Sequence, residues 1–412
     1  MKSRLAFVAA AAVVIAVLTD TALAQGRGGR GIPVPQMAED AVYEYQTHRE
    51  RIQVRVLTKG LVNPWSIAFL PDNSMLITER DGQLRHFSDG ELSPPIAGMP
   101  EVRSDGFISG LHDIVLHPDF EDNNLVYFVY NKPEVIEGAP AGGGGRGGRG
   151  GRGGANVRSQ LTVARAVWDG TALRGSEDII SPTGASTVSR LLFLPDGTLL
   201  VGTWGEPGEM AQEKLGLSGK ILRYTDDGDV PADNPFVGNS EYAPEIYSLG
   251  HRTPESLVYH EGRVFESEMG PNGGDEVNII VPGGNYGWPL VSLGRSYAGP
   301  YQPEVFEMEG MIDPIVNFVP SISVTNLTFY TGDLFPEWQG NMFIGGVRYG
   351  EIPGTGRLQR IEMNENFEET AREELLTDLR VRIRGAWTTD DGYIYVLTDE
   401  ADGALLRIEP AG

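Results

Sequence analysis

The sequence predicts an all-β protein, a six-bladed β-propeller whose blades are four-stranded and antiparallel. Two observations predict this fold. Glycine and proline, which favour turns, number 54 and 27 among 412 residues. In addition, an apolar strand, a turn of Pro, Asp, Asn or Gly and a second apolar strand recur six times along the chain. This recurrence favours a single repeat architecture, and a pair of β-sandwiches is the alternative.

Each repeat is interpreted as a β-hairpin because apolar residues alternate on both sides of a turn. The six hairpins span 69–79, 115–130, 193–203, 258–268, 329–346 and 387–400. A four-stranded blade takes roughly 40–50 residues, so the longer intervals between hairpins leave room for inserted loops. We therefore expect each hairpin to lie in a different blade, with the propeller spanning 46–412.

The N-terminus predicts export to the periplasm or the medium. Lys2 and Arg4 precede an apolar run over 5–18, which is too short for a typical membrane span. Residues 22–24, Ala-Leu-Ala, form a small-x-small cleavage site. The sequence therefore predicts a signal peptide over 1–24, with an uncleaved anchor as the alternative. No span is expected after cleavage, and residues 25–45 are expected to form a flexible leader.

The stretch over 138–154 is rich in glycine and arginine and lies between two strands of the second hairpin region. Arginine–glycine tracts bind RNA when they are long and exposed. This one carries three arginines in a chain of net charge −24, and such a charge repels nucleic acid and anionic membranes. A surface loop is therefore the favoured interpretation, with no nucleic-acid partner.

Composition also limits the chemistry that the chain can perform. There is no cysteine, which excludes disulfides, thiolate metal sites, iron–sulfur clusters and a cysteine nucleophile. The acidic balance suits neutral or cationic partners, or calcium binding, although a solubilising surface charge explains it equally well.

Two groups of residues indicate a binding site. Arg382 and Arg384 are two apart on a predicted strand and so share one face, and Arg252 and Arg348 add guanidinium groups from distant segments. Guanidinium groups bind carboxylates in a bidentate manner. The second group is a Gly-Pro turn followed by carboxylates in the stretch 266–278, and these supply the oxygen ligands that calcium selects. Ordinary surface salt bridges are the alternative for the arginines.

Several longer segments resemble the soluble aldose sugar dehydrogenases that depend on pyrroloquinoline quinone (PQQ), the glucose/sorbosone dehydrogenase family. The resemblance covers about residues 50–410. Its most specific segments are NPWSIAFLPDNSMLITER (63–80), GLHDIVLHPDF (110–120), SGKILRYTDDGDVPADNPF (218–236), EMGPNGGDEVN (268–278), GGNYGWP (283–289) and VRIRGAWTTDDGYIYVLTDE (381–400). The resemblance implies the six-bladed fold, PQQ and calcium as cofactors, and oxidation of an aldose or oligosaccharide to a lactone.

The resemblance also implies roles for individual residues. The calcium ligands would be Gly270, Pro271 and Asp275. The residues that bind the cofactor would be Arg252, Arg348, Arg382 and Arg384. Arg348 stands where the family has lysine. Arg252 would also stabilise charge on the quinone, and Glu206 would be the remaining candidate base.

The same resemblance exposes departures from the family pattern. The catalytic histidine of the family is Ser186 here, and a serine alone is too weakly basic to replace it near neutral pH. A glutamine of the second blade is Ile108, an asparagine is Thr253, and a glutamine or histidine before the Gly-Pro pair is Met269.

His112 and His251 are the remaining histidines near these motifs, and packing roles are favoured for both. The leading expectation is therefore a sugar dehydrogenase with impaired or altered catalysis, whose electron acceptor the sequence leaves unknown. The alternatives are a non-catalytic propeller that binds sugar or protein, and a calcium-dependent hydrolase or lyase.

Overall fold

The computed structural model describes residues 34–106, 108–135, 157–185, 188–206, 208–297, 299 and 305–412, with the side chains of residues 135 and 157 left aside. These residues belong to one unit, 32–412. The predicted signal peptide over 1–24, the glycine- and arginine-rich loop over 138–154 and Ser186 lie outside the described residues.

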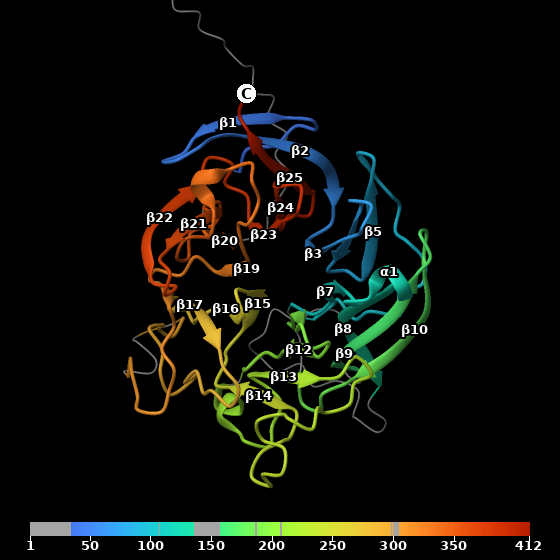
Figure 1. Ribbon diagram of the computed structural model, residues 1–412, viewed down its shortest axis with the longest axis vertical. Coiled ribbons are helices and arrows are strands. Elements are labelled where there is room, and N and C mark those ends of the chain that lie inside the picture. The colour runs from blue at the N-terminus through green and yellow to red at the C-terminus, as the bar shows by residue number, and fades with distance from the viewer. Residues whose placement is uncertain are drawn as a thin grey trace, which may run out of the picture. The chain divides into compact units, whose positions relative to one another are not determined.

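Four of the sheets contain four strands each, and every strand is antiparallel to its neighbours (Figure 1). The first sheet comprises β3 (Pro64–Phe69), β4 (Met75–Glu79), β5 (Gln83–Ser88) and β6 (Glu91–Leu92). The second comprises β7 (Leu111–Leu116), β8 (Leu125–Val135), β9 (Val157–Trp168) and β10 (Leu173–Ile180). The third comprises β11 (Leu191–Phe193), β12 (Leu199–Gly202), β13 (Lys220–Tyr224) and β14 (Ile246–Leu249). The fourth comprises β15 (Pro254–His260), β16 (Arg263–Glu268), β17 (Asp275–Ile280) and β18 (Val316–Phe318).

The fifth sheet has nine strands in the order β1-β2-β25-β24-β23-β19-β20-β21-β22. Its strands are β1 (Val42–Gln46), β2 (Arg51–Leu61), β19 (Val324–Phe329), β20 (Met342–Gly346), β21 (Arg357–Met363), β22 (Glu369–Leu375), β23 (Ile383–Thr388), β24 (Ile394–Thr398) and β25 (Gly403–Pro410). The described helices are the short α1 (Phe120–Asn123) and the 3₁₀ turns η1 (Gly208–Gln212) and η2 (Pro336–Trp338). None of them is long and apolar enough to cross a membrane.

The all-β prediction and the four-stranded antiparallel blades are confirmed, but the expectation of six separate sheets is wrong. The hairpins that start at 329 and 387 share the nine-stranded sheet, whose two halves meet at a single parallel pair, Asn326 and Gly385. Glycine permits this pair, because a Cβ atom at Gly385 would lie 2.5 Å from Cβ of Asn326. The alternation of apolar and polar residues predicts pairing within a hairpin, so it could not predict this contact between two hairpins.

The hairpin turns repeat one local structure. In the first, Leu70 N donates to Ser74 O at 2.8 Å, and Asp72 accepts the Ser74 N–H. In the third, Leu194 N donates to Thr198 O at 2.8 Å, and Asp196 accepts from Thr198 in the same way. A side chain that bonds its own backbone two residues on favours a tight turn, so the Pro-Asp signal is physically explained.

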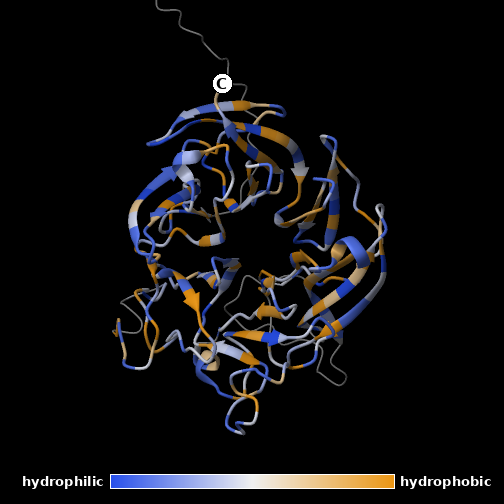
Figure 2. Cartoon of the chain, viewed as in Figure 1, coloured by the Kyte–Doolittle hydropathy of each residue, from blue (hydrophilic) through white to orange (hydrophobic). Residues whose placement is uncertain are grey.

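The six strands that begin the predicted hairpins form a closed series. Each of β3, β7, β11, β15, β19 and β23 contacts the next, and β23 contacts β3. Apolar side chains fill the spaces between neighbouring sheets, for example Leu76, Leu84 and Phe128 between the first and second. Figure 2 shows hydrophobic positions recurring along the strands of the five sheets.

Polar side chains join the strands of this series to one another. Ser66 Oγ donates to Asp113 at 2.5 Å, and the other oxygen of Asp113 accepts the Leu191 N–H at 2.8 Å. Further along the series, Ser256 bonds Asn326 at 3.2 Å, and Asn326 donates to the Ala386 carbonyl at 2.9 Å. These side chains are buried, so each polar group needs its partner.

Strands from the two ends of the unit close the fifth sheet. β2 pairs antiparallel with β25 from Ile52–Pro410 to Leu61–Gly403. On its other side β2 pairs with β1, so residues 42–45 of the predicted flexible leader belong to the sheet instead. The alternating burial of β1 explains why this segment is a strand, since one face packs on the core and the other is exposed.

Truncation of Leu406 tests the contribution of this closure to stability. Leu406 is fully buried between Val56 and Val396. Leu406→Ala is expected to lower the free energy of unfolding by about 2–5 kcal/mol, because it removes buried methyl groups and leaves a cavity. Urea unfolding measures the change. Val42→Ala in β1, where 41% of the residue is exposed, is the control and should change the free energy of unfolding by about 0.5 kcal/mol or less. Equal losses of unfolding free energy in the two variants would contradict the role of the β2–β25 pairing in stability.

Candidate functional site

A cavity of about 420 Å³ is lined by residues of the first, fourth and fifth sheets and of the loops that adjoin all five sheets. Its size falls in the range of small-molecule sites. Trp65, Trp204 and Tyr297 supply aromatic surface. The four arginines singled out from the sequence, Arg252, Arg348, Arg382 and Arg384, all line it, and so does Gly270.

A fifth arginine, Arg80, lines the same cavity and was missed in the sequence analysis. It follows the last residue of β4 directly. Burial lowers the pKa of its guanidinium group, and the positive charges of Arg384 and Arg382 lower it further. Its position in the sheet could have identified it. Residues that directly follow the second strand of other sheets, such as Met269 after β16 and Val347 after β20, also line the cavity.

Glutamates at the ends of second strands hold the loops that carry two of these arginines. The backbone N–H of Arg252 donates to Glu268 at 2.7 Å, and that of Arg382 donates to Glu400 at 3.0 Å. In the first sheet the N–H of Val62 donates to Glu79 at 2.7 Å in the same manner. A carboxylate, buried in Glu79 and Glu268 and partly buried in Glu400, thus fixes each loop at the point where it enters a first strand.

Asp399 positions Arg382 and Arg384 as a pair. One carboxylate oxygen accepts from Arg382 at 2.7 Å and from Arg384 at 2.5 Å. Burial alone would raise the pKa of Asp399, but the two guanidinium groups outweigh burial and hold it at about 2. The two side chains differ in exposure, which is 44% for Arg382 and 4% for Arg384.

Arg384 is further fixed by a ring and by a second acid. Its guanidinium carbon lies 4.0 Å from the centre of the Trp65 ring, and Glu255 lies 3.5 Å from its Nη1. Glu255 also lies 3.9 Å from Arg190, a buried guanidinium group that is 3.5 Å from Asp113. Burial raises the pKa of Glu255 although both arginines oppose the shift.

Arg252 and Glu206 form an ion pair beside the cavity. Arg252 Nε donates to Glu206 Oε1 at 3.0 Å, and its Nη1 donates to the Met269 carbonyl at 2.8 Å. The guanidinium group also lies 5.3 Å from the Trp288 ring. Glu206 is partly exposed and therefore reachable by solvent.

Arg80 and Arg348 differ from the other three arginines. Neither forms an ion pair with a carboxylate in the described part of the chain, and both are half-buried. Cations that face a cavity without a protein partner favour an anionic ligand. The donor set therefore suits a small molecule with more than one carboxylate.

The Gly270–Pro271 turn borders the cavity, whereas Asp275 lies behind it. A Cβ at Gly270 would lie 2.2 Å from the carbonyl oxygens of Gly273 and Gly274, so only glycine fits there. The buried Asp275 carboxylate accepts from Gly270 N, Ser321 Oγ and the N–H groups of residues 322 and 324. Burial raises its pKa to about 6, against these hydrogen bonds. The contacts favour a positioning role for Asp275.

The positions that depart from the family pattern make one part of the wall less polar. Ile108, Thr253 and Met269 all line the cavity. Ile108 has φ of 48°, which is strained for a β-branched residue. Its carbonyl pairs with His112 Nε2 at 2.9 Å, and burial lowers the pKa of His112 to about 3, so this histidine is neutral. His251 is buried too, with its Nε2 2.8 Å from Ser248 Oγ.

Comparisons with known proteins agree with the fold. The family model for glucose/sorbosone dehydrogenases matches residues 61–407. The aldose sugar dehydrogenase YliI of Escherichia coli is 37% identical over 368 residues, which cover 87% of this chain and 93% of that protein. The apo crystal structure of the soluble E. coli aldose sugar dehydrogenase superposes with a TM-score of 0.76 at 34% identity, over 87% of this chain and all of the other.

Two more distant proteins extend the comparison. The quinoprotein glucose dehydrogenase B of Acinetobacter calcoaceticus is 26% identical over 323 residues, which cover 69% of this chain and 63% of that protein. The PQQ-bound aldose sugar dehydrogenase of Streptomyces coelicolor shares the fold, with a TM-score of 0.65 at 24% identity over 86% of this chain and 97% of the other.

Asp399→Asn tests the ion pairs that hold the two arginines. The pKa of Asp399 is about 2 in the folded protein, against an ordinary value of 3.8, so the unfolded chain binds more protons between these values. The ion pairs should therefore contribute on the order of 2 kcal/mol above about pH 4 and lose this contribution as the pH falls toward 2. Urea unfolding at several pH values should show a flatter dependence in Asp399→Asn. The exposed Asp402→Asn should retain the wild-type slope, and an unchanged slope in Asp399→Asn would contradict the assignment.

Proposed function

The chain belongs to the glucose/sorbosone dehydrogenase family, and from this we propose that it is an exported oxidoreductase that converts aldose sugars to lactones with PQQ and calcium. The observation that carries the proposal is the cavity in which five arginines gather, two of them without an acidic partner among the described residues. The names of the E. coli and Acinetobacter relatives, an aldose sugar dehydrogenase and a quinoprotein, support the substrate class and the cofactor.

The residues present fit PQQ, which is a quinone that bears several carboxylates. Arg80 and Arg348 offer guanidinium groups free to bind carboxylates, and Arg382 and Arg384 present a pair already oriented by Asp399. Bound PQQ would supply a quinone that accepts a hydride from the sugar. The preorganised arginines would bind the cofactor with little further ordering, since their orientation is fixed before it arrives.

Arg252 and Glu206 would act next to the sugar. Arg252 is fixed by Glu206, Met269 O and the Trp288 ring, so it can stabilise negative charge where that charge develops. Glu206 would take the proton from the anomeric hydroxyl. Its carboxylate already accepts a hydrogen bond from Arg252 at 3.0 Å, and we expect slow turnover in a chain that has Ser186 where the family has histidine.

Calcium would bind at the Gly270–Pro271 turn through backbone carbonyl oxygens, a donor type that calcium accepts. The Asp275 carboxylate already receives hydrogen bonds from four groups. We therefore assign it the task of holding the turn against residues 321–324. A calcium-dependent hydrolase or lyase is disfavoured for the same reason, because it would need an Asp275 carboxylate that is available to act on a substrate.

We also propose that the nine-stranded sheet is two blades, which makes six in all. Three observations support the count: the single parallel pair that joins its halves, the closed series of six first strands and the apolar cluster between the halves. The predicted signal peptide and the periplasmic or secreted location remain part of this proposal. A non-catalytic propeller is the second candidate, favoured by Ile108 at the cavity wall.

Reconstitution with PQQ and calcium tests the cofactor site. Arg348→Ala is expected to weaken PQQ binding by about 1.5–3 kcal/mol, the range for hydrogen bonds to charged groups. A titration followed by the visible spectrum of bound PQQ measures the affinity. Arg174→Ala removes an exposed arginine of β10 and should leave it unchanged. Equal affinity in wild type and Arg348→Ala would exclude a role for this arginine.

Installing an imidazole tests the missing base. Ser186→His should raise dye-linked aldose oxidation by at least about 100-fold, because a positioned general base contributes 10²- to 10⁴-fold. Ser186→Ala is the control that adds no base, and PQQ affinity should be equal in all three proteins. Rapid turnover by the wild type, or no gain in Ser186→His, would place the base elsewhere. Failure to bind PQQ at all would refute the dehydrogenase proposal.

A further inference from the structure

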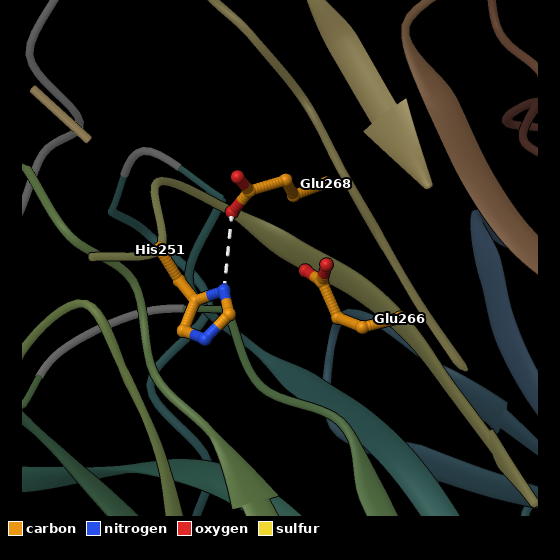
Figure 3. Close-up of side chains that lie close together, drawn as sticks. All are labelled: His251, Glu266 and Glu268. Atoms are coloured by element: carbon orange, nitrogen blue, oxygen red, sulfur yellow. Dashed lines mark ion pairs between the residues drawn. The ribbon is translucent and has the colours of Figure 1, made fainter. Parts of the chain in front are cut away.

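We propose that His251, Glu266 and Glu268 bind one divalent transition-metal ion at a buried site (Figure 3). None of the three side chains lines the arginine-rich cavity. The site therefore lies outside that cavity, although Glu268 also accepts the N–H of Arg252 at 2.7 Å, and the inference does not require PQQ or calcium to be bound.

The local fold brings three ligand atoms together. Glu266 and Glu268 are two apart on β16 and so lie on the same face of the fourth sheet. His251 comes from the loop between β14 and β15, and its ring faces both carboxylates in Figure 3. One ligand atom from each residue lies within 4.8 Å of the others.

The spacing is close to that of a bound ion. Zinc binds nitrogen and oxygen at about 2.0–2.2 Å, so tetrahedral ligand atoms lie about 3.4 Å apart. The distance between His251 Nδ1 and Glu268 Oε2 is 3.7 Å. This pair needs to move by only tenths of an ångström, and the other two pairs, which lie within 4.8 Å, need to close by at most about 1.4 Å to reach the same spacing.

Two atoms of the cluster have no partner in the protein. His251 Nδ1 and Glu266 Oε1 are buried and form no hydrogen bond, and both residues have 0% exposure. Buried polar atoms nearly always have a partner. Both atoms belong to the ligand set, so a single ion between them would satisfy both.

Charge leads to the same conclusion. Glu266 and Glu268 are buried, and a third carboxylate, the partly exposed Glu276, faces Glu268 across the strand pair β16–β17. Among the described residues no lysine or arginine side chain forms an ion pair with any of the three. Buried carboxylates require a compensating cation or a proton, and a divalent ion supplies the charge at the position where the ligand atoms converge.

Surrounding groups fix the ligands and leave their free atoms facing inward. His251 Nε2 pairs with Ser248 Oγ at 2.8 Å, and the imidazole stacks on Tyr286 with ring centres 4.7 Å apart. Asn278 Nδ2 donates to Glu266 Oε2 at 3.1 Å. Partners of this kind orient metal ligands. An imidazole nitrogen among them favours a transition metal over calcium.

Zinc titration of metal-free protein in excess calcium tests the site, because calcium occupies oxygen-only sites. We expect one tightly bound zinc per chain by elemental analysis, and a melting temperature that rises with zinc. Glu266→Gln should weaken zinc binding by at least about 100-fold, since loss of an outer partner alone costs 10- to 100-fold. Its melting temperature should no longer respond to zinc.

Glu79→Gln is the matched control, because Glu79 is an equally buried strand-end glutamate that has an arginine partner, Arg85, at 3.1 Å. It should bind zinc as the wild type does. Cobalt substituted into the wild type should give visible bands of a nitrogen- and oxygen-ligated ion, a readout that needs no variant. Absence of stoichiometric zinc and of cobalt bands, or wild-type zinc binding by Glu266→Gln, would overturn the proposal and leave a proton as the charge that joins these groups.

Discussion

Buried polar contacts between successive first strands are the constraint on which the rest of the structure depends. Every junction in the closed series has one: Ser66 with Asp113, Asp113 with Leu191, Arg190 with Glu255, Ser256 with Asn326, Asn326 with Ala386, and Arg384 with Trp65. The hydrogen-bonded groups are satisfied only if their neighbours are in register, whereas Arg190 and Glu255, 3.9 Å apart, interact through charge without a hydrogen bond. The arrangement of the sheets is thereby tied to the placement of the site arginines, since Arg384 is itself one of the links.

The hairpins and most of the arginines were predictable because their signals are local. The Pro-Asp turns between apolar strands are visible in the sequence, and two arginines two apart on a strand must share a face. The joining of the last two hairpins was not predictable, because it depends on one glycine, Gly385, that lets β19 and β23 approach. Arg80 was not predicted because a single arginine after a strand has no neighbouring motif that indicates a site. Asp399 and Glu255 were missed because an acid that orients an arginine looks like any other acid in a chain of net charge −24.

The cavity combines two electrostatic designs. Arg382, Arg384 and Arg252 each have an acidic partner, so their orientation is settled within the protein at the cost of some attraction for a ligand. Arg80 and Arg348 lack such a partner in the described part of the chain, which keeps their charge available. Arginines held by an acid would set the orientation of a bound ligand, and arginines without an acidic partner would contribute more to its affinity. The less polar wall at Ile108 and Met269 lies among these charges.

The pairing of β2 with β25 also orders events during synthesis. The paired residues are 342 positions apart at Leu61–Gly403 and 358 apart at Ile52–Pro410, so β2 emerges from the ribosome long before the strand that will cover its open edge. β1 protects one side of β2 from the start, but the other side must wait for β25. Contacts of such long range are slow to form because loop closure precedes them. Arg382, Arg384 and Asp399 precede β25, so a nascent chain has no complete cavity until these residues have been made.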